Sequence, residues 1–153
     1  MINRPNPYMA AGHLIQPLIE FGNTVAAMGL EPSLVELIKI RASQINGCAM
    51  CLHMHVRDAR KAGESEMRIF LLDAWRESPL FTARERAAMG WTEALTRLGD
   101  EYARERAYEA VAQEFTAEEQ VKLTLMITAI NSFNRLNVAF KVVHPGSAAR
   151  VAA

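Results

Sequence analysis

The chain has two cysteines, and both lie in one short motif, Cys48-Ala-Met-Cys51, with His55 four residues further on. If the segment is helical, these three side chains share one face, with neighbouring Cβ atoms about 5 to 6 Å apart. Two adjacent thiols can cycle between a dithiol and a disulfide, and an imidazole can accept and return the protons that this cycle moves. The spacing therefore predicts a redox-active dithiol with a base beside it.

A thiolate, rather than a thiol, attacks peroxides and disulfides, so the reactivity of each cysteine depends on what lowers its pKa. With Asn46 as the N-cap, Cys48 would lie in the first turn of a helix, where unpaired N–H groups favour negative charge. Cys51 lies about one turn deeper, and it would depend on His55 as its base. His53 points to another side of the helix, because each residue turns the helix by about 100°.

Glu36 is the acid that could complete a set of thiol, base and acid. If 33–46 and 48–62 form an antiparallel hairpin, Glu36 lies about ten residues from the turn and His55 about eight or nine, which at about 1.5 Å per residue places them within about 2 Å in depth. A carboxylate beside His55 would orient the imidazole and stabilise its protonated form. Spacing alone equally allows a capping box, in which Ser33 and Glu36 bond the backbone at a helix start.

Apolar residues recur at helical spacing along almost the whole chain, whereas alternating runs of strand length are absent. The sequence therefore predicts an all-α fold, in which the CxxC motif opens the second helix of a helical hairpin. Capping boxes are predicted at Ser33-x-x-Glu36, Thr82-x-x-Glu85 and Thr116-x-x-Glu119. The expected helices span residues 8–28, 33–46, 48–62, 65–75, 82–98, 100–113 and 116–140.

Composition and charge exclude several classes of protein. The 153 residues carry 17 basic and 17 acidic side chains, and neither sign forms a long block, which argues against nucleic acid or an anionic membrane as a partner. The N-terminus lacks signal-peptide features, and no apolar run approaches the length of a membrane span. We therefore expect a cytoplasmic protein, with one domain over residues 1–145 and a flexible tail over 146–153. In a reducing compartment, a CxxC motif is more often catalytic or metal-binding than a structural bridge.

The last predicted helix is apolar on most of its sides between Val121 and Phe140. Such a helix is normally buried all round, and short amphipathic neighbours would cover it incompletely. We therefore expect a second subunit to cover part of this helix or of the first one. Asn131, Asn134 and Arg135 interrupt the apolar surface, and we expect them to tie helices or subunits together, since buried polar groups need partners.

The four candidate site residues also carry a resemblance. Their pattern resembles the signature of the alkylhydroperoxidase AhpD family, within the wider carboxymuconolactone decarboxylase superfamily. It consists of Glu36, eleven residues, Cys48, two residues, Cys51, three residues and His55. The similarity extends over most of the chain from about residue 14 to 140. Its most similar stretches are residues 36–48, 91–96 and 130–137.

The resemblance implies an all-helical protein that assembles as trimers or hexamers and reduces alkyl hydroperoxides with its dithiol, in antioxidant defence. By the same resemblance, Cys51 is the thiolate that attacks the peroxide, and Cys48 is the resolving thiol that closes the disulfide. Glu36 and His55 form the proton relay. No bound cofactor or metal is implied, and the external reductant is a lipoyl-bearing protein or another dithiol carrier.

One departure from the family pattern concerns the residues between the cysteines. Members with full peroxidase activity carry a histidine there that assists the relay, whereas this chain has Ala49 and Met50. His53 is then a candidate auxiliary base. The helix dipole favours Cys48 as the more acidic thiol, whereas the resemblance favours Cys51 as the attacking one.

Four other interpretations of the motif remain open from the sequence. The cysteines could be buried and inert, since free cysteine often packs as a small apolar side chain. Cys48, Cys51, His55 and Glu36 could supply four zinc ligands, although structural zinc sites usually draw two ligands from a second motif that is missing here. A general dithiol oxidoreductase would need no peroxide. The decarboxylase branch of the superfamily lacks the cysteine pair, and a pocket protein of that kind without peroxidase activity is the last alternative.

Overall fold

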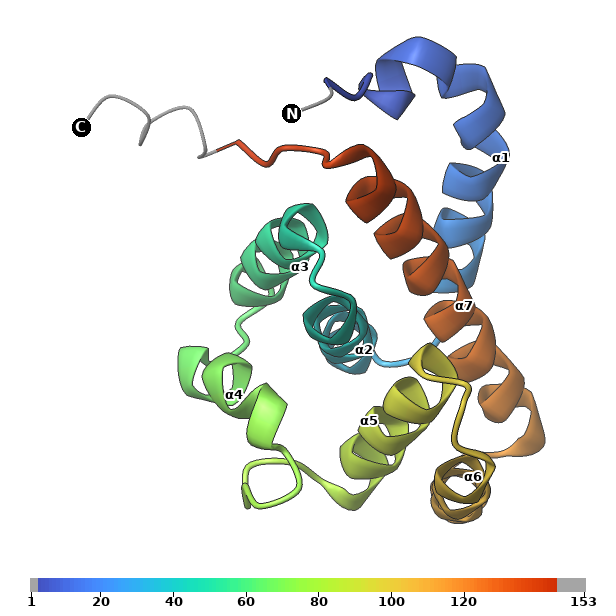
Figure 1. Cartoon of the computed structure of the whole chain (residues 1–153). Helices are drawn as coiled ribbons and strands as arrows, with labels where there is room; N and C mark the ends of the chain where they lie inside the picture. Colours follow the sequence, from blue (N-terminus) through green and yellow to red (C-terminus); the bar gives the residue numbers. More distant parts are fainter. Residues whose placement is uncertain (1–2, 146–153) are drawn as a thin grey trace.

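The computed structural model describes residues 3–145, which form seven α-helices and one short 3-10 helix without any strand (Figure 1). The all-α prediction is confirmed. Within this described part of the chain, no helix combines the length and the hydropathy that crossing a membrane requires. The tail predicted at 146–153 lies outside the described residues. The helices are α1 (Pro7–Ala26), α2 (Pro32–Asn46), α3 (Ala49–Lys61), α4 (Glu66–Phe70), η1 (Leu71–Ala74), α5 (Ala83–Thr96), α6 (Glu101–Glu114) and α7 (Ala117–Phe140).

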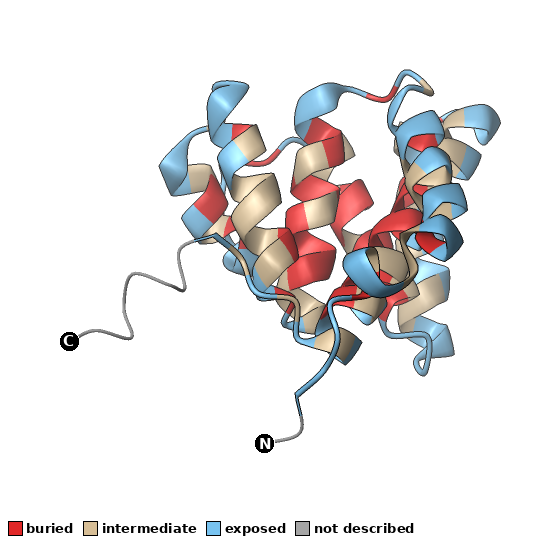
Figure 2. Ribbon diagram, turned by 90° about the horizontal axis from the view of Figure 1, so that it is seen from above, coloured by how far each residue is buried: buried red, intermediate tan, exposed pale blue. Residues whose placement is uncertain are grey.

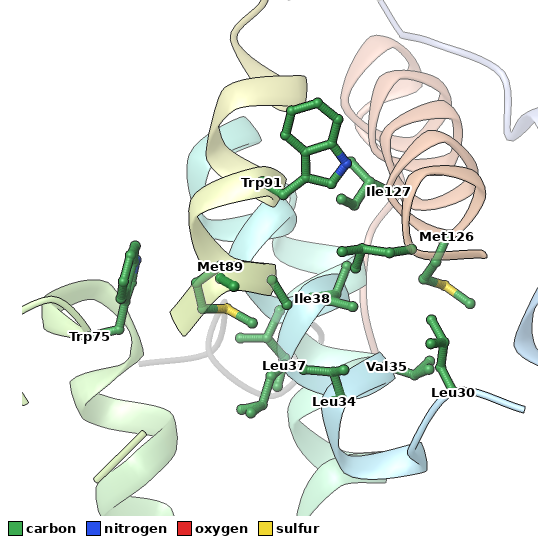
Figure 3. Packing of buried hydrophobic residues seen from close by; sticks show 14 of the residues in the cluster. Leu30, Leu34, Val35, Leu37, Ile38, Trp75, Met89, Trp91, Met126 and Ile127 are labelled. Atoms are coloured by element: carbon green, nitrogen blue, oxygen red, sulfur yellow. The ribbon is translucent and has the colours of Figure 1, made fainter. Parts of the chain in front are cut away.

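α2 is the central helix, with α3, α5, α7 and the 3-10 helix η1 packed around it (Figure 1). Its sequence is apolar on most sides, and Leu37, Ile38 and Ile40 have no exposed surface. In the core, side chains from α5, such as Met89, and from α7, such as Met126, meet those of α2 (Figure 3). Buried residues gather on the inner sides of the helices, and exposed ones face outward (Figure 2). The α2–α3 hairpin that should carry the site is therefore anchored in the core.

α7 is only partly covered by the helices of its own chain. One side of it packs into the core through residues such as Leu123 and Ile127, whereas Val121 and Val138 remain 58% and 42% exposed. This incomplete cover agrees with the expectation for a single chain. Cover of the remaining apolar surface by a second subunit stays a prediction.

Two of the three predicted capping boxes are confirmed. Thr82 caps α5 and Thr116 caps α7, and in each box the glutamate three residues later bonds back to the backbone. The box predicted at Ser33 is wrong, because a proline at the first helical position makes Glu31 the N-cap of α2. The carboxylate of Glu36 is thus free of the helix start and can interact with α3.

The turn between α2 and α3 differs from the prediction in one detail. α2 ends at Asn46, because Gly47 adopts the left-handed conformation with φ of 65°, which glycine tolerates best. The prediction that Asn46 is the N-cap of the next helix is therefore wrong. Cys48 itself is the N-cap of α3, and its Sγ accepts a hydrogen bond from the backbone N–H of Cys51 at 3.3 Å.

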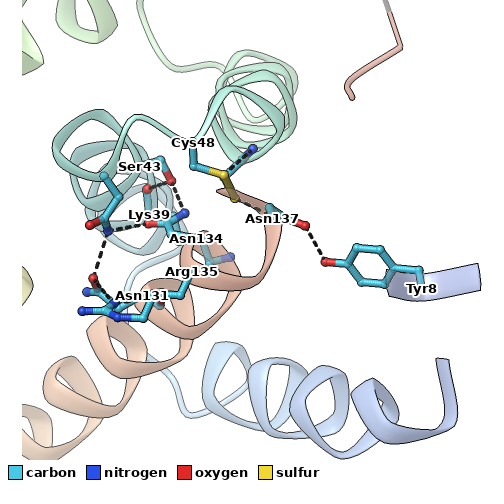
Figure 4. The surroundings of a disulfide bond; sticks show 10 residues. Tyr8, Lys39, Ser43, Cys48, Asn131, Asn134, Arg135 and Asn137 are labelled. Atoms are coloured by element: carbon cyan, nitrogen blue, oxygen red, sulfur yellow. Dashed lines mark hydrogen bonds between the residues drawn. A yellow bond between two sulfur atoms is a disulfide. The ribbon is translucent and has the colours of Figure 1, made fainter. Parts of the chain in front are cut away.

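Asparagines on α7 fasten this turn to the rest of the fold (Figure 4). The fully buried Asn134 donates from Nδ2 to the Oγ of Ser43 at 3.0 Å, and its Oδ1 accepts from Nδ2 of Asn46 at 2.9 Å. Oδ1 of Asn131 accepts from the same Asn46 amide at 2.9 Å and from Arg135 at 3.0 Å. The prediction that these polar residues tie helices together is confirmed, since they join α7 to the end of α2.

Candidate active site

The two cysteines form a disulfide at the start of α3 (Figure 4). Their Cα atoms are 5.4 Å apart, a normal distance for a disulfide, and the side chains are almost completely buried. Because Cys48 is the N-cap, its sulfur lies at the positive end of α3, where unpaired N–H groups stabilise a thiolate. The greater acidity of Cys48 thus stays a prediction, with Cys48 rather than Asn46 as the helix cap.

Cys51, in contrast, faces a cavity. The cavity has a volume of about 460 Å³, lies among α1, α3 and α7, and is lined by Cys51 and His55 but not by Cys48. Most of the lining is apolar, and the polar groups in it include Tyr8, Lys39 and Asn137. The apolar side chains include Ile19, Met50, Met54, Met126, Ile130 and Phe133. A ligand in this space can reach the Cys51 sulfur and the His55 imidazole together.

The hairpin geometry brings Glu36 to His55, as the sequence predicts. Nδ1 of His55 lies 3.0 Å from Oε2 of Glu36, and both side chains are largely buried. A carboxylate at Nδ1 fixes the ring orientation and leaves Nε2 as the nitrogen that can exchange a proton with a neighbour. The pair therefore has the arrangement of a base held by an acid.

Lys39 is a further member of this cluster. Its Nζ donates to Oε1 of Glu36 at 2.9 Å, one turn along α2. Burial raises the pKa of Glu36, but hydrogen bonds and charge from His55 and Lys39 lower it by more, so the net pKa lies below its usual range. Glu36 thus keeps its negative charge at neutral pH.

The structure does not bring every candidate to the cavity. His53 lies with its ring stacked on that of His144, with ring centroids 5.0 Å apart, and it is not among the cavity residues. Among residues 3–145, no three or more histidine, cysteine, aspartate or glutamate side chains are arranged to hold a metal ion. His55 is the one imidazole in the described lining of the cavity.

Two residues at the site escape the sequence reasoning. Nδ2 of Asn137 donates to the sulfur of Cys51 at 3.3 Å, and the hydroxyl of Tyr8 donates to Oδ1 of Asn137 at 2.9 Å. Asn137 follows Asn131 and Asn134 at intervals of three residues on an apolar helix, and this repeat was a usable signal. Tyr8 carries no such signal, because nothing in the sequence places α1 beside α7.

Comparison with known proteins identifies the family. The model of the carboxymuconolactone decarboxylase family matches residues 14–94. The chain belongs to this family. Protein YdfG of Bacillus subtilis strain 168 is 44% identical over 104 residues, which cover 68% of this chain and 71% of that relative. Protein YnjA of Escherichia coli K12 is 30% identical over 121 residues, or 76% of this chain and 64% of that one.

Solved structures in the comparison agree with the AhpD-like fold. A crystal structure from Agrobacterium tumefaciens has 42% sequence identity and a TM-score of 0.89, covering 94% of this chain and 99% of that one. That protein is of unknown function and is described as a candidate AhpD antioxidant defence protein. An alkylhydroperoxidase AhpD core protein from Ralstonia eutropha JMP134, at 15% identity and a TM-score of 0.79, covers 91% of this chain and 74% of its own. This distant match shows a shared fold only.

The charge balance at Glu36 gives a testable prediction. Lys39→Met removes one of the two groups that lower the pKa of Glu36, and the pKa of Glu36 should therefore rise. NMR of the Glu36 carboxyl carbon during a pH titration measures this change. Lys122→Met is the matched control, because it removes a lysine that pairs with the exposed Glu118.

The same substitution should change acid stability in a defined direction. Because the pKa of folded Glu36 is lowered, its ionised form stabilises the folded state above the unfolded pKa, and this contribution is lost as pH falls through the folded pKa. In Lys39→Met the pKa of folded Glu36 lies closer to the unfolded value, so the contribution should be smaller and its loss should be complete at a higher pH. Circular dichroism during acid titration measures this change. An unchanged Glu36 titration would show that Lys39 does not hold this charge.

Proposed function

We propose that this protein is a thiol peroxidase, which reduces organic hydroperoxides through a dithiol and disulfide cycle of Cys48 and Cys51. The observation that carries the proposal is that Cys51 and His55 line the same apolar cavity, and that Nδ1 of His55 lies within hydrogen-bond distance of Glu36. An apolar space beside a thiol and a base favours a substrate with a hydrocarbon group over a small polar one. The likeness to the Agrobacterium protein described as a candidate AhpD supports the same activity.

The cavity supports Cys51 rather than Cys48 as the attacking thiol. The helix terminus favours Cys48 as the more acidic thiol, but Cys48 is not in the lining of the cavity and Cys51 is. A substrate must reach the attacking sulfur, and the leaving oxygen must reach a proton donor. Cys51 and His55 both line the cavity, and this supports Cys51 as the attacking thiolate.

In the first step, the Cys51 thiolate attacks the terminal oxygen of the hydroperoxide. The O–O bond breaks, the alkoxide takes a proton from His55 and leaves as an alcohol, and Cys51 becomes a sulfenic acid. Glu36, at 3.0 Å from Nδ1, holds the His55 ring in the orientation for this transfer. General acid catalysis of this kind typically contributes about 10²- to 10⁴-fold in rate.

In the second step, the Cys48 thiolate attacks the sulfur of Cys51. The S–O bond breaks, the oxygen leaves as water after protonation, and the disulfide forms. An external dithiol, of the lipoyl type or on another dithiol carrier protein, then attacks Cys51 from the cavity. Cys48 at the helix terminus is a good leaving thiolate in that exchange, since a low pKa speeds departure.

A general dithiol oxidoreductase is the second candidate. Ala49 and Met50 occupy the positions between the cysteines, and His53 is not in the cavity, so His55 is the one described imidazole that can serve Cys51. A site with a single base favours thiol exchange, which needs less proton transfer than peroxide cleavage. Peroxide consumption separates the two candidates.

The cysteine roles predict three distinct results with one equivalent of cumene hydroperoxide. The reduced wild type should consume the peroxide and lose two hydrogens by intact mass. Cys48→Ser should still consume it and gain one oxygen as a trapped sulfenic acid, whereas Cys51→Ser should not react. Serine suits the Cys48 position, because it is itself a good N-cap.

The oxidised wild type should then regain both hydrogens when dihydrolipoamide is added. The opposite pattern in the two single variants would make Cys48 the attacking thiol. Oxidation by a disulfide, without any loss of peroxide, would leave the general dithiol oxidoreductase as the function.

The cavity predicts a preference among peroxides. Ala26 is exposed at the end of α1 and lines the cavity, so Ala26→Phe should narrow it and raise KM for cumene hydroperoxide by about tenfold. The KM for hydrogen peroxide should change little, because that molecule needs no apolar space. Ala27→Phe is the matched control, since Ala27 is exposed but does not line the cavity. Equal effects on both peroxides would contradict binding of the organic group here.

We also propose that the protein assembles as a homo-oligomer, a trimer or hexamer. Apolar side chains lie exposed on α1, where Met9 and Leu14 are 85% and 70% exposed, and on α7 at Val121 and Val138. Burial of such side chains drives subunit association. Size-exclusion chromatography with light scattering should give a multiple of the 17.0 kDa chain at micromolar concentration, and a monomer mass would refute the assembly.

A further inference from the structure

Asn137 lies between the reactive sulfur and α1. Its Nδ2 donates to Sγ of Cys51 at 3.3 Å, and its Oδ1 accepts from the hydroxyl of Tyr8 at 2.9 Å (Figure 4). Asn137 is 6% exposed, and all three side chains line the cavity. The amide therefore contacts the sulfur between two buried side chains, where a hydrogen bond to a charged group is stronger than in water.

The Tyr8 hydroxyl determines which end of the amide meets the sulfur. A thiolate can only accept hydrogen bonds, so it needs the NH₂ end of Asn137 rather than the oxygen. A tyrosine hydroxyl that donates to Oδ1 holds the amide in that orientation. Burial raises the pKa of Tyr8, against a smaller lowering by its bond to Asn137, so the hydroxyl keeps its proton at neutral pH.

An oriented N–H donor meets a need that the rest of the site leaves open. Cys51 is one turn from the helix terminus that serves Cys48, and the residues between the cysteines supply no imidazole. A hydrogen bond to a charged acceptor is roughly twice as strong as one between neutral groups, so the donor favours thiolate over thiol.

The titratable and charged groups around Cys51 come from α1, α2 and α3. α7 adds no charged side chain to the described cavity lining, so the Asn137 amide is its polar contribution to the sulfur. The groups are Cys48 and His55 on α3, Glu36 and Lys39 on α2, and Tyr8 on α1.

We propose that Asn137 stabilises the Cys51 thiolate by direct contact and that Tyr8 is the positioning residue that holds Asn137 in place. The consequence for peroxide reduction rests on the proposed function, but the stabilisation of the thiolate does not. Because Tyr8 belongs to α1, which also forms a wall of the cavity, the same helix that bounds the substrate space sets the donor at the sulfur.

The test uses the Cys48→Ser protein, in which Cys51 is the one thiol, and follows its alkylation by iodoacetamide against pH by intact mass. Asn137→Leu, which keeps the branched shape but has no N–H donor, should move the midpoint of thiolate formation up by about one pH unit or more. Tyr8→Phe removes one hydroxyl and should move it in the same direction by less, because the amide can still reach the sulfur.

Tyr108→Phe is the matched control. The Tyr108 hydroxyl also donates to a side-chain amide oxygen, that of Gln120 at 3.1 Å, but neither residue is in the cavity lining. This variant should leave the midpoint unchanged. A merely structural role for Tyr8 and Asn137 would lower the melting temperature without moving the midpoint, and an unmoved midpoint in both variants overturns the proposal.

The alkylation midpoint is independent of peroxide turnover, so the two proposals fail separately. A raised midpoint in protein that consumes no hydroperoxide supports the Tyr8–Asn137 pair and refutes the peroxidase. Peroxide turnover with an unmoved midpoint refutes the pair and supports the peroxidase.

Discussion

The short turn at Gly47 is the constraint on which the site depends. The left-handed conformation of this glycine ends α2 and makes Cys48 the N-cap of α3. The chain then returns alongside α2 with the register that places His55 3.0 Å from Glu36. α2 lies in the core, and Asn134 on α7 bonds Ser43 and Asn46 in its last turn, so the turn is anchored to α7. The dithiol is therefore held by core packing rather than by a flexible loop.

Acidity and access are divided between the two cysteines. Cys48 lies at the N-terminus of α3 but does not line the cavity, whereas Cys51 lines the cavity but lies one turn further along the helix. This division suits a two-step cycle, since a sulfur that attacks a substrate needs space and a proton donor, whereas a resolving sulfur needs only its neighbour. In the proposed cycle, the helix terminus at Cys48 would also favour its departure as a thiolate when a dithiol opens the disulfide.

The sequence predicts what local periodicity and hairpin geometry determine, and it misses what distant packing determines. The helices and the Glu36–His55 pair follow from spacing, because a hairpin fixes relative depth at about 1.5 Å per residue. The predicted N-caps of α2 and α3 are wrong, because a single neighbour decides each of them. These neighbours are the proline before Ser33 and the Gly47 before Cys48. The cavity and Tyr8 could not be predicted, since they require α1 to lie on α7, which no short-range pattern encodes.

The attachment of α1 to α7 is consequently part of the active-site architecture. α1 packs mainly on α7, and a Cβ at Gly22 would lie 2.9 Å from the ring of Phe133, so glycine permits this close approach. Gly22 and Phe133 both line the cavity, and the Tyr8–Asn137 hydrogen bond joins the same two helices nearer the α1 N-terminus. The Gly22–Phe133 contact thus limits the width of the cavity, and the Tyr8–Asn137 contact orients the amide that donates to the Cys51 sulfur. A displacement of α1 would alter both together, which couples the space for a substrate to the state of the thiol.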